Sequence, residues 1–532
     1  MLSPVRSDRQ VRYDRQLRLW GDHGQKALEY ACVGLLNATA TGTEILKSLV
    51  LPGIGSFKII DGAKVTAQDA GSNFFLDRED IGKPRGEVAC KLLKELNPDV
   101  EGECLVESCA QLLDNNVAIL DQFSLVIATD LPEKLAAQIG DYLWQRDIPF
   151  ILCRAYGMLA YMRVCVREHT IVEAHPENRF HDLRLDRLFP ELKTLLDAVD
   201  LDALDHKEHS HTPYLVVLMK AVDKWRQERN QPDAFPSSYA HKKEIRRILL
   251  GMRKPDDKGR LDEENFQEAV DSLNLALHPT CVPTEVSAVL SEESACELSQ
   301  ESSAFWLLCH GLKQFVASEQ VLPVRGTLPD MTADSGRYVE LQEVFHHKAT
   351  EDAKLVYDLI QKKLSELSLP PEKVTLEQAI TFCKHSAFLR VIRGRSVRQE
   401  LSDCSLAKEV MQRQDPLFAW YVALRATERF FAEKGRYPGT NGIPIGLDKN
   451  DLRNRVQTLL KEWQCEQLAE LVKIEVVQEM CRYGASELHP VASILGGVAA
   501  QAAIKLITKQ YVPVDNTYIL DTHSGNAGVY KL

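Results

Sequence analysis

The chain has 532 residues, of which 45% are hydrophobic and 26% charged, and its formal net charge is −12. This is the composition of a folded globular protein, which excludes a disordered or fibrous chain, and the length corresponds to roughly three to four domains. The acidic balance argues against a general nucleic-acid-binding protein, because such a protein presents a basic face to the phosphates.

The thirteen cysteines are scattered and no C-x-x-C spacing occurs, so a zinc site of that type is not supported. We expect mostly buried, free thiols in a reducing compartment. The N-terminus is charged and lacks the apolar core of a secretory signal. No apolar run reaches the roughly 18 residues that a membrane span needs. We therefore expect a cytoplasmic or nuclear protein without a membrane span.

Strands and helices are expected to alternate over residues 31–165. Short apolar runs predict buried strands, and longer segments with helical spacing of apolar residues predict the helices between them. This alternation is typical of a parallel sheet with crossover helices. The predicted strands cover 31–36, 56–62, 103–107, 124–130 and 149–154, and the predicted helices cover 41–51, 86–98 and 132–146.

From residue 166 onward the predicted elements are mainly helical. Between two of these helices, residues 322–338 are rich in Pro, Gly, Asp and Thr, which predicts a long loop. Near the end of the chain we expect one apolar helix over 490–508 and two closing strands over 516–521 and 527–532. The helices predicted from periodicity cover 295–320, 339–365, 376–393, 405–434 and 451–472.

The loop after the first predicted strand, GLLNATATG at 34–42, is where a nucleotide-binding fold keeps its glycines. The G-x-G-x-x-G fingerprint is missing, and Asn37, Thr39 and Ala40 carry side chains where a close approach of phosphate needs none. The loop is either a modified phosphate loop that uses its threonine hydroxyls or part of a nucleotide fold whose pocket is no longer used. The loop taken alone favours the second interpretation.

Four further segments resemble ubiquitin-activating enzymes and the related bacterial sulfur-carrier adenylyltransferases. They follow the order of that family along the chain. The resemblance implies an α/β fold with a Rossmann-like adenylation domain, formed by residues 1–165 and 487–532, and a large, mainly helical insertion over 166–486. The segments are YDRQLRLWGDHGQKAL (13–28), LVLPGIGSFKIID (49–61), DIGKPRGEVACKLLKELNP (80–98) and ELHPVASILGGVAAQAAIKLITKQYVPV (487–514).

The same resemblance implies that the adenylation site is degenerate. Three of four loop glycines, the ribose-binding carboxylate and the Arg and Gln that handle phosphates are absent. We therefore expect no cofactor to bind to this chain and place ATP and Mg in a partner subunit. The family's motif positions fall on Asn37, Thr39, Ala40 and Gly42 in the loop, on Asp61 and Ala63 after the second strand, on NFFLD at 73–77, on Arg85 in place of a Lys, and on Asp130 as the Mg-proximal Asp.

Arg15, in the sequence YDRQL, is the catalytic-type residue that remains. In paired members of the family an Arg at this position crosses the interface toward the nucleotide of the opposite half, so the resemblance implies that Arg15 acts in trans. A guanidinium suits this role because its planar donors match phosphate oxygens. The alternative is an ordinary surface helix on which Arg15 pairs with Asp14 or Asp22.

Two other clusters deserve a chemical interpretation. Cys383 lies beside Lys384 and His385 and is a candidate nucleophile, but its place on an apolar helical stripe favours a buried core thiol. Three histidines at 206, 209 and 211 could hold a metal, but H-x-x-H-x-H is not a standard ligand spacing. We expect no metal site in this chain.

The loop at 322–338 resembles a segment in the regulatory subunits of heterodimeric family members. Loops on a helical scaffold are common binding surfaces, so we expect this loop to contact the partner chain. The expected contact residues are Arg325, Asp330, Met331, Asp334, Ser335 and Tyr338.

Together with the degenerate loop, the resemblance to this family implies the inactive, regulatory half of a paired enzyme. Its catalytic partner would carry ATP, Mg and the reactive cysteine, activate a ubiquitin-like modifier and pass it to a conjugating enzyme. No nucleic acid is expected among the partners. Two alternatives remain open, namely an autonomous adenylyltransferase with a divergent loop and a non-catalytic Rossmann-fold adaptor unrelated to adenylation.

Overall fold

The computed structural model describes residues 8–176 and 181–532. Contacts between residues divide the chain into two compact units. Unit 1 consists of Met1–Ile171 and Val391–Leu532, and unit 2 consists of Val172–Arg390. The helical insertion expected over 166–486 contributes residues to both units.

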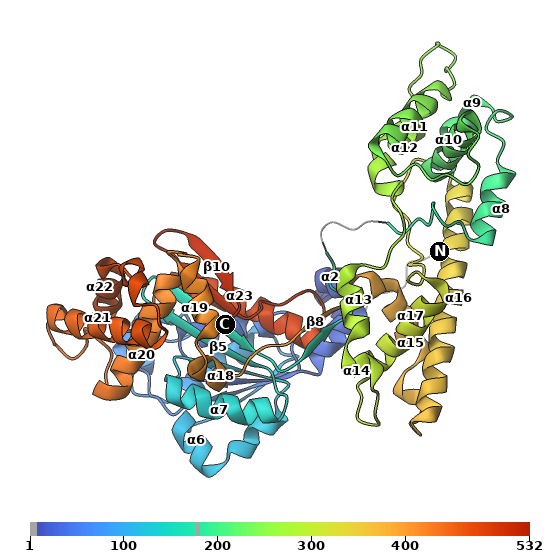
Figure 1. Cartoon of the computed structure of the whole chain (residues 1–532). Coiled ribbons are helices and arrows are strands. Elements are labelled where there is room, and N and C mark those ends of the chain that lie inside the picture. Colours follow the sequence, from blue (N-terminus) through green and yellow to red (C-terminus); the bar gives the residue numbers. More distant parts are fainter. Residues whose placement is uncertain (1–7, 177–180) are drawn as a thin grey trace. The chain divides into compact units, whose positions relative to one another are not determined.

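Unit 1 is built on an eight-stranded sheet of order β10-β9-β6-β5-β4-β1-β2-β3 (Figure 1). The first five strands pair in parallel, whereas β6, β9 and β10 pair antiparallel. The order 3-2-1-4-5 is that of a doubly wound nucleotide fold. The strands are β1 (Cys32–Leu36), β2 (Ser56–Ile60), β3 (Glu101–Leu105), β4 (Leu125–Thr129), β5 (Phe150–Tyr156), β6 (Leu159–Cys165), β9 (Thr517–Asp521) and β10 (Asn526–Tyr530).

The five strands expected in the N-terminal region and the two closing strands are confirmed within a few residues. Strand β6 is a finding that the sequence did not suggest. Its segment contains Arg163, a residue type that is rarely found fully buried. Here Arg163 is fully buried because Glu400 forms an ion pair with it at 2.5 Å.

Helices cover both faces of this sheet (Figure 1). One core joins the first strands to α3 and α23, with Ile45 and Leu49 of α3 and Leu495 and Ala499 of α23 among its buried members. The helices of this part are α1 (Asp8–Arg12), α2 (Asp14–Glu29), α3 (Ala40–Val50), α4 (Ala67–Ser72), α5 (Arg85–Leu96), α6 (Cys109–Asn115), α7 (Glu133–Gln145) and α23 (His489–Thr508).

Helix α23 has the length and hydropathy of a membrane-spanning helix. It is the one such helix in the described residues, and 56% of its most apolar window is buried inside the protein. It packs along α3 in the core of unit 1. The composition is therefore that of a core helix, in which small residues such as Ala499 and Ala503 allow close packing.

The C-terminal helices of unit 1 form a second core against the antiparallel strands. Phe418 and Val422 pack there with Ile519 of β9. The single helix predicted over 405–434 is in fact two helices, because the chain turns at Asp415 and Pro416. These helices are α18 (Val397–Ser402), α19 (Ser405–Gln412), α20 (Phe418–Lys434), α21 (Ile445–Glu462) and α22 (Ile474–Tyr483).

Unit 2 is helical, with a core that contains Trp225, Phe266 and Phe345. A short pairing of β7 (His169–Ile171) with β8 (Arg390–Ile392) lies where the chain passes between the units. The helices of unit 2 are α8 (Pro190–Ala198), α9 (His206–Ser210), α10 (Tyr214–Arg229), α11 (Tyr239–Gly251), α12 (Glu264–Ala276), α13 (Thr284–Ser291), α14 (Glu293–Cys296), α15 (Ala304–Glu319), α16 (Ser335–Glu366) and α17 (Leu376–His385).

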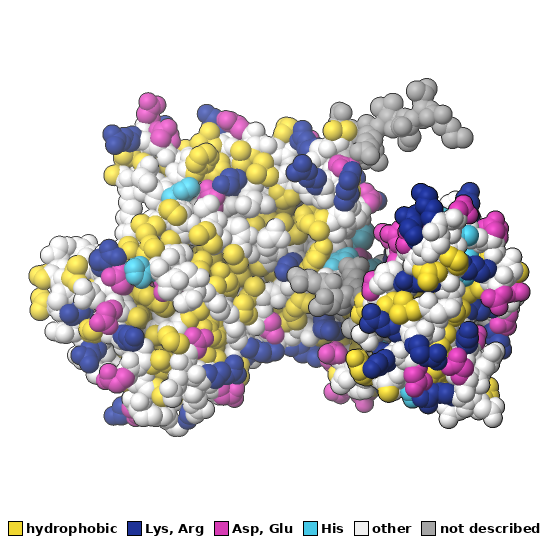
Figure 2. All heavy atoms as spheres, turned by 90° about the horizontal axis from the view of Figure 1, so that it is seen from above, with side chains coloured by type: hydrophobic (Ala, Val, Ile, Leu, Met, Phe, Trp, Pro, Cys, Tyr) yellow, Lys and Arg dark blue, Asp and Glu magenta, His cyan; other side chains and the backbone are white. Residues whose placement is uncertain are grey.

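One part of unit 2 has a positive net charge, although the whole chain is acidic. Residues 214–260, which include α10 and α11, carry twelve Lys and Arg against six Asp and Glu. Figure 2 shows many of the Lys and Arg side chains of this unit at its surface. Several of them already have acidic partners, such as Arg229 with Glu244 at 2.7 Å and Arg247 with Glu228 at 2.8 Å.

Candidate functional site

The candidate site is the loop between β1 and α3. It lies at the carboxyl ends of β1 and β4, where the strand order reverses and where open α/β sheets bind their ligands. Asn37 follows β1 with a left-handed φ of 67°, a conformation that usually favours glycine. Thr39 then caps α3, and its hydroxyl accepts a hydrogen bond from the Gly42 N–H at 3.4 Å.

Hydrogen bonds tie this loop to the end of β4. The Asn37 side-chain amide donates to the Thr129 carbonyl at 2.9 Å, and the Thr129 hydroxyl donates to the Asn37 carbonyl at 2.7 Å. A third bond joins the hydroxyls of Thr39 and Thr129 at 3.0 Å. Gly42 is the one family glycine that remains, and a Cβ there would lie 2.8 Å from the Asn37 carbonyl oxygen. The loop is thus held closed by its own polar groups.

The carboxylate of Glu487 lies at the N-terminus of α3. It accepts hydrogen bonds from the Ala40 N–H at 2.8 Å and from the Thr41 hydroxyl at 2.6 Å. The Thr41 N–H donates to it at 3.4 Å. The Thr39 hydroxyl lies 3.1 Å from the carboxylate and can donate its single proton either to Glu487 or to Thr129. A helix N-terminus of this kind is the position at which a nucleotide fold binds phosphate.

The surroundings of Glu487 act on its charge in opposite directions. Removal of the carboxyl group from water raises the pKa of Glu487, and the nearby charge of Asp130 adds to that rise. The hydrogen bonds from Thr41, Thr39 and the Ala40 N–H partly offset it, because donors at a helix start favour the ionised carboxylate.

The remaining carboxylate of the D-x-D position is also used internally. Asp61 is buried and accepts bonds from the Ala38 N–H at 2.9 Å and from Arg85 Nε at 2.8 Å. Arg85 also pairs with Asp69 at 3.0 Å. Its positive charge, which stands at the position of a family Lys, is therefore balanced by two carboxylates of the same chain.

Asp130, at the position of the family's Mg-proximal Asp, has an arginine partner. Its carboxylate pairs with Arg154 at 2.9 Å, and Arg154 also forms an ion pair with Glu428 from α20. Both Arg154 and Glu428 are buried. A carboxylate held by a guanidinium is poorly suited to bind a cation, because its charge is already compensated.

The residues present do not fit ATP and Mg in this chain. The phosphate position holds Glu487, the Mg-proximal Asp130 holds Arg154, and no carboxylate stands at Ala63 for the ribose. Asn73 of the NFFLD segment accepts a hydrogen bond from the Thr43 hydroxyl at 3.0 Å. The polar groups that this fold would offer a nucleotide thus bind one another.

Arg15, in contrast to these polar groups, has no partner within the described chain. Its side chain is exposed on α2, and within residues 8–176 and 181–532 it has no hydrogen bond or ion pair. The pairings considered for it do not occur, since Asp14 pairs with Arg18 at 2.9 Å and Asp22 pairs with Arg9 at 3.0 Å and with Lys26. The role of Arg15 toward a partner's nucleotide stays a prediction.

The start of α2 is firmly attached to unit 1 even though Arg15 is exposed. Tyr13, two residues earlier, is buried, and its hydroxyl accepts a hydrogen bond from Asn97 at 3.0 Å. Further along, the Gln510 side chain donates to the Trp20 carbonyl at 2.9 Å. These bonds therefore anchor the helix that carries Arg15.

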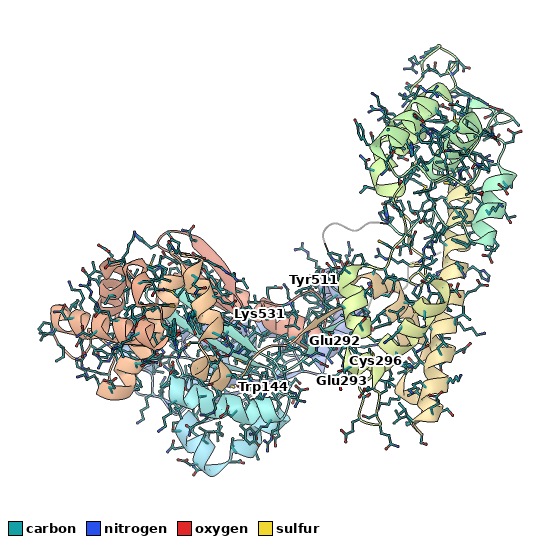
Figure 3. The ribbon with its side chains drawn as sticks, viewed as in Figure 1. Trp144, Glu292, Glu293, Cys296, Tyr511 and Lys531 are labelled. Carbon is teal, nitrogen blue, oxygen red and sulfur yellow. The ribbon has the colours of Figure 1, made fainter. Side chains whose placement is uncertain are left out.

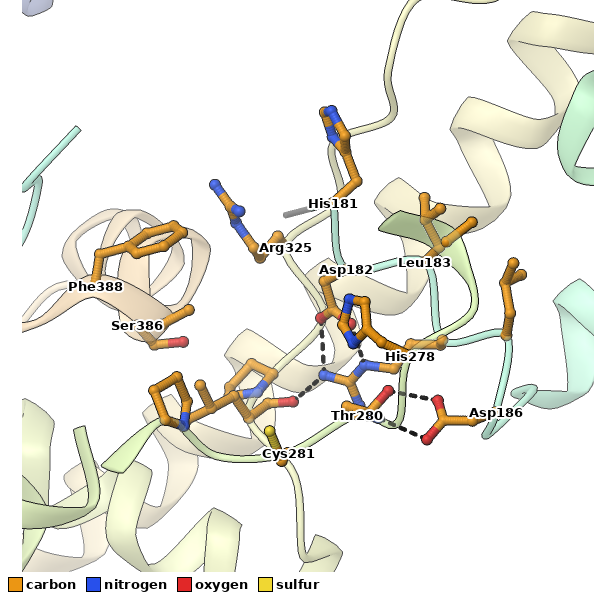
Figure 4. A pocket seen from close by; sticks show the side chains of 17 residues that line it. His181, Asp182, Leu183, Asp186, His278, Thr280, Cys281, Arg325, Ser386 and Phe388 are labelled. Atoms are coloured by element: carbon orange, nitrogen blue, oxygen red, sulfur yellow. Dashed lines mark hydrogen bonds and ion pairs between the residues drawn. The ribbon is translucent and has the colours of Figure 1, made fainter. Parts of the chain in front are cut away.

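Arg325, the first predicted contact residue of the 322–338 loop, is buried within unit 2. Its Nε donates to the Lys384 carbonyl at 3.3 Å, and its guanidinium lies 4.7 Å from the centre of the Phe388 ring. It lines a cavity of about 190 Å³ together with Asp182 and Arg184 (Figure 4). This end of the loop takes part in the internal packing of unit 2.

The other predicted contact residues lie nearer the surface. Asp330, Asp334 and Ser335 are exposed, whereas Met331 and Tyr338 are half-buried. Asp334 also has a structural role, because its carboxylate caps α16 and its N–H donates to the His211 carbonyl at 2.7 Å. Contact of these residues with a partner stays a prediction.

The histidine cluster has an internal explanation. His209 is buried, stacks on Phe266 and bonds to Glu263 at 2.6 Å, while His211 bonds to the Lys207 carbonyl at 2.9 Å. A different group brings possible metal ligands together within the described residues. The side chains of Glu191, His347 and Glu351 place one ligand atom each within 4.8 Å of one another, in a surface position unrelated to the loop of unit 1.

Cys383 is confirmed as a buried thiol. Burial raises its pKa to about 12, with a further contribution from Asp352, so it is a poor nucleophile. Two other cysteines, Cys281 and Cys296, are exposed. Figure 3 shows Cys296 at the end of α14, where Lys313 Nζ lies 2.9 Å from its sulfur.

Three site residues were not predicted from the sequence: Glu487, Arg154 and Glu428. Glu487 lies 447 positions after Ala40, and Glu428 lies 274 positions after Arg154. The one signal was that Glu487 begins the C-terminal segment that resembles the family. Nothing in that pattern pointed its carboxylate at the first loop.

Comparison with known proteins agrees with this geometry. The ThiF family model matches residues 13–528. The NEDD8-activating enzyme E1 regulatory subunit of Danio rerio is 44% identical and is covered along 100% of both chains. The subunit of that name in Xenopus laevis is 45% identical over 98% of this chain and 99% of its own. The subunit AXR1 of Arabidopsis thaliana is 33% identical over 99% of this chain and 97% of its own.

These matches confirm the Rossmann-like adenylation fold that the sequence motifs predicted. They extend over both units rather than over the α/β unit alone. The chain belongs to the ThiF family and, within it, to the family of NEDD8-activating enzyme E1 regulatory subunits.

Proposed function

We propose that this chain is the non-catalytic, regulatory subunit of a heterodimeric enzyme that activates a ubiquitin-like modifier in the neddylation pathway. Its obligate partner is the catalytic subunit of the neddylation-activating enzyme, which binds ATP and Mg. The pair joins the modifier's C-terminal carboxylate to AMP with release of pyrophosphate. The modifier then passes to a cysteine of the partner with release of AMP, and on to a conjugating enzyme for cullin neddylation in the cytoplasm or nucleus.

The observation that carries this proposal is the closed state of the chain's own nucleotide position. Glu487 occupies the N-terminus of α3 and Arg154 holds Asp130. A chain that keeps the adenylation fold but blocks its phosphate position needs a second subunit to supply the chemistry. The full-length similarity to regulatory subunits supports the same assignment of a regulatory role to this chain and a catalytic role to its partner.

Arg15 is the residue that we propose to complete the partner's site. It is a permanent cation with no partner of its own in the described chain, and α2 holds it at the surface. A guanidinium that enters a site from another subunit stabilises the charge that develops on transferring phosphate groups. This chain would thus take part in catalysis without binding the nucleotide.

The surface of unit 1 is suited to a large protein interface. Figure 2 shows broad areas of hydrophobic side chains on one face of this unit. Phe74 is 70% exposed and Leu19 is 52% exposed. Exposed apolar area of this kind is typical of obligate interfaces, which bury on the order of 2,000 Å² or more. In unit 2 we propose that Asp330 and Met331 of the loop and Ser335 at the start of α16 add contacts.

The experiment that tests the proposal is ATP–pyrophosphate exchange with the ubiquitin-like modifier of neddylation. It is measured for this chain alone, for a catalytic subunit alone and for the mixture. We expect exchange to require the mixture. Exchange by this chain alone would contradict the proposal and favour an autonomous adenylyltransferase. A stable complex without gain of exchange would favour a non-catalytic adaptor.

A further inference from the structure

The N-terminus of α3 already contains an anion that belongs to the chain itself. The first turn of α3 has no acidic residue of its own. The carboxylate of Glu487 comes from a segment 447 positions further on. Such a helix start carries a partial positive charge and free N–H groups, so it binds carboxylate and phosphate by the same donors.

We propose that Glu487 is a built-in substitute for phosphate, and that removing its carboxylate turns the start of α3 into a binding site for inorganic phosphate or pyrophosphate. The nucleotide position is then not only degraded in sequence but also occupied from within. The inference concerns this chain alone and does not depend on the partner proposed above.

The donor set supports a true anion site rather than an ordinary helix cap. Two backbone N–H groups, of Ala40 and Thr41, and the Thr41 hydroxyl donate to one carboxylate at distances from 2.6 to 3.4 Å. The Thr39 hydroxyl lies 3.1 Å from the same carboxylate and shares its single proton between Glu487 and Thr129. Thr39 is the N-cap residue and so satisfies part of the helix start by itself. Thr39 stands at one of the family's glycine positions, whereas Thr41 stands at the variable position before Gly42.

Electrostatics makes the two anions exclude each other. A phosphate at the same donors would lie within a few ångströms of the Glu487 carboxylate, and like charges at such a distance repel strongly in a partly buried site. The neighbouring cations would not relieve this, because Arg85 is shared by Asp61 and Asp69 and Arg154 by Glu428 and Asp130. In the intact chain Glu487 therefore prevents phosphate binding.

The vacated site should accept phosphate but not the rest of a nucleotide. Ala63 stands where the family has its ribose-binding carboxylate, and Asp61 already accepts bonds from the Ala38 and Ala63 N–H groups and from Arg85. No gain is therefore expected from adding adenosine. ATP should bind no more tightly than pyrophosphate does.

The test uses the full-length chain with Glu487→Ala and Glu487→Gln. Binding of phosphate, pyrophosphate and ATP is measured by calorimetric titration, and thermal unfolding is followed in phosphate and in chloride at equal ionic strength. The matched control is Glu479→Ala, which also removes one carboxylate but from the surface of α22, where Glu479 pairs with Arg482.

We expect Glu487→Ala to bind pyrophosphate roughly tenfold or more tightly than the unchanged chain, because a repelling charge at the helix start is replaced by space. Phosphate should raise its melting temperature, whereas chloride and the control variant should show no such effect. The inference is overturned if neither Glu487 variant gains phosphate binding, or if a variant that unfolds in chloride is not recovered by phosphate. Much tighter binding of ATP than of pyrophosphate would also contradict it.

Discussion

Two regions of unit 1 treat their charged and polar groups in opposite ways. In the loop between β1 and α3, Asn37, Thr39 and Glu487 all have partners within the chain. On α2, the Arg15 guanidinium is exposed and has none in the described residues. Groups that bind one another have a structural role, whereas an isolated cation on a well-anchored helix is available to another molecule.

The two regions also differ in how far they keep the family's pattern, which is lost in the loop and kept around Arg15 on α2. The loop lost glycines and gained side chains that close it, so its fold serves as a support. The anchoring of α2 through Tyr13 and Gln510 keeps Arg15 in a defined place. This pattern is what a subunit needs when it completes a partner's site and has none of its own.

The largest effect is expected from breaking the buried ion pair behind the loop. Glu428→Ala would leave Arg154 buried with only the half-exposed Asp130 as its acidic partner. Removal of one member of a buried pair costs about 3–5 kcal/mol, so the free energy of unfolding from urea titration should fall by that amount. A loss below about 1 kcal/mol, the range of exposed pairs, would contradict this account of the loop's support.

The next effect concerns activity. Arg15→Ala should lower pyrophosphate exchange by the mixture roughly 100- to 1,000-fold, the cost of removing one preorganised group that stabilises transition-state charge. Complex formation should be unchanged. The matched control is Arg18→Ala on the same helix, because Arg18 is exposed but pairs with Asp14. Equal losses in both variants would argue against a specific role for Arg15.

A third prediction examines a group that lacks a hydrogen bond but is buried, unlike Arg15. His169 Nε2 has no hydrogen-bond partner in the described chain, and burial lowers the pKa of His169 to about 4, with a smaller effect of Lys509. The unfolded chain binds a proton below about pH 6.5 and the folded chain does not. His169 should therefore contribute a fall of about 2–3 kcal/mol in the free energy of unfolding as the pH drops from 6.5 to 4.

Replacement of this histidine provides the control. In His169→Leu that contribution disappears, so urea titrations between pH 4 and 6.5 should show a flatter dependence on pH. A slope equal to that of the unchanged chain would mean that His169 is protonated in the folded state. It would then behave as an accessible group rather than as a buried one.

The smallest effect should come from the anchor of α2. Tyr13→Phe removes the bond from Asn97 and leaves the ring in place, which should cost about 1 kcal/mol of unfolding free energy. Exchange by the mixture should fall less than tenfold, because Gln510 and the buried ring still hold the helix. A loss as large as that of Arg15→Ala would show that the position of α2 depends on this single bond.

Much of the fold could be predicted from the sequence because its signals are local. The apolar runs of β1 and β4 and the helical spacing of α3 and α23 lie within single segments, and the structure has them within a few residues. Strand β6 was missed because Arg163 interrupts its pattern. That arginine is acceptable in a core because Glu400, Thr517 and the Leu532 carbonyl bind it, and all three lie far away in the sequence.

The loss of the glycines from the candidate site could be predicted from the sequence. The carboxylate that takes the phosphate position could not. Missing glycines can be counted in a sequence, so the degenerate loop around Asn37 and Thr39 was expected. The position of the Glu487 carboxylate at the N-terminus of α3 depends on a contact between distant segments of the chain. Arg325 shows the same limit, because its loop indicated a surface contact while the fold buried its side chain.

The most direct test of the central claim is the number of nucleotides bound by the assembled pair. Equilibrium binding of ATP is measured for this chain, for the catalytic subunit and for the purified heterodimer. We expect one ATP per heterodimer and none on this chain alone, because Glu487 occupies the phosphate position of this chain. Two nucleotides per heterodimer, or saturable binding of ATP to this chain alone, would contradict it.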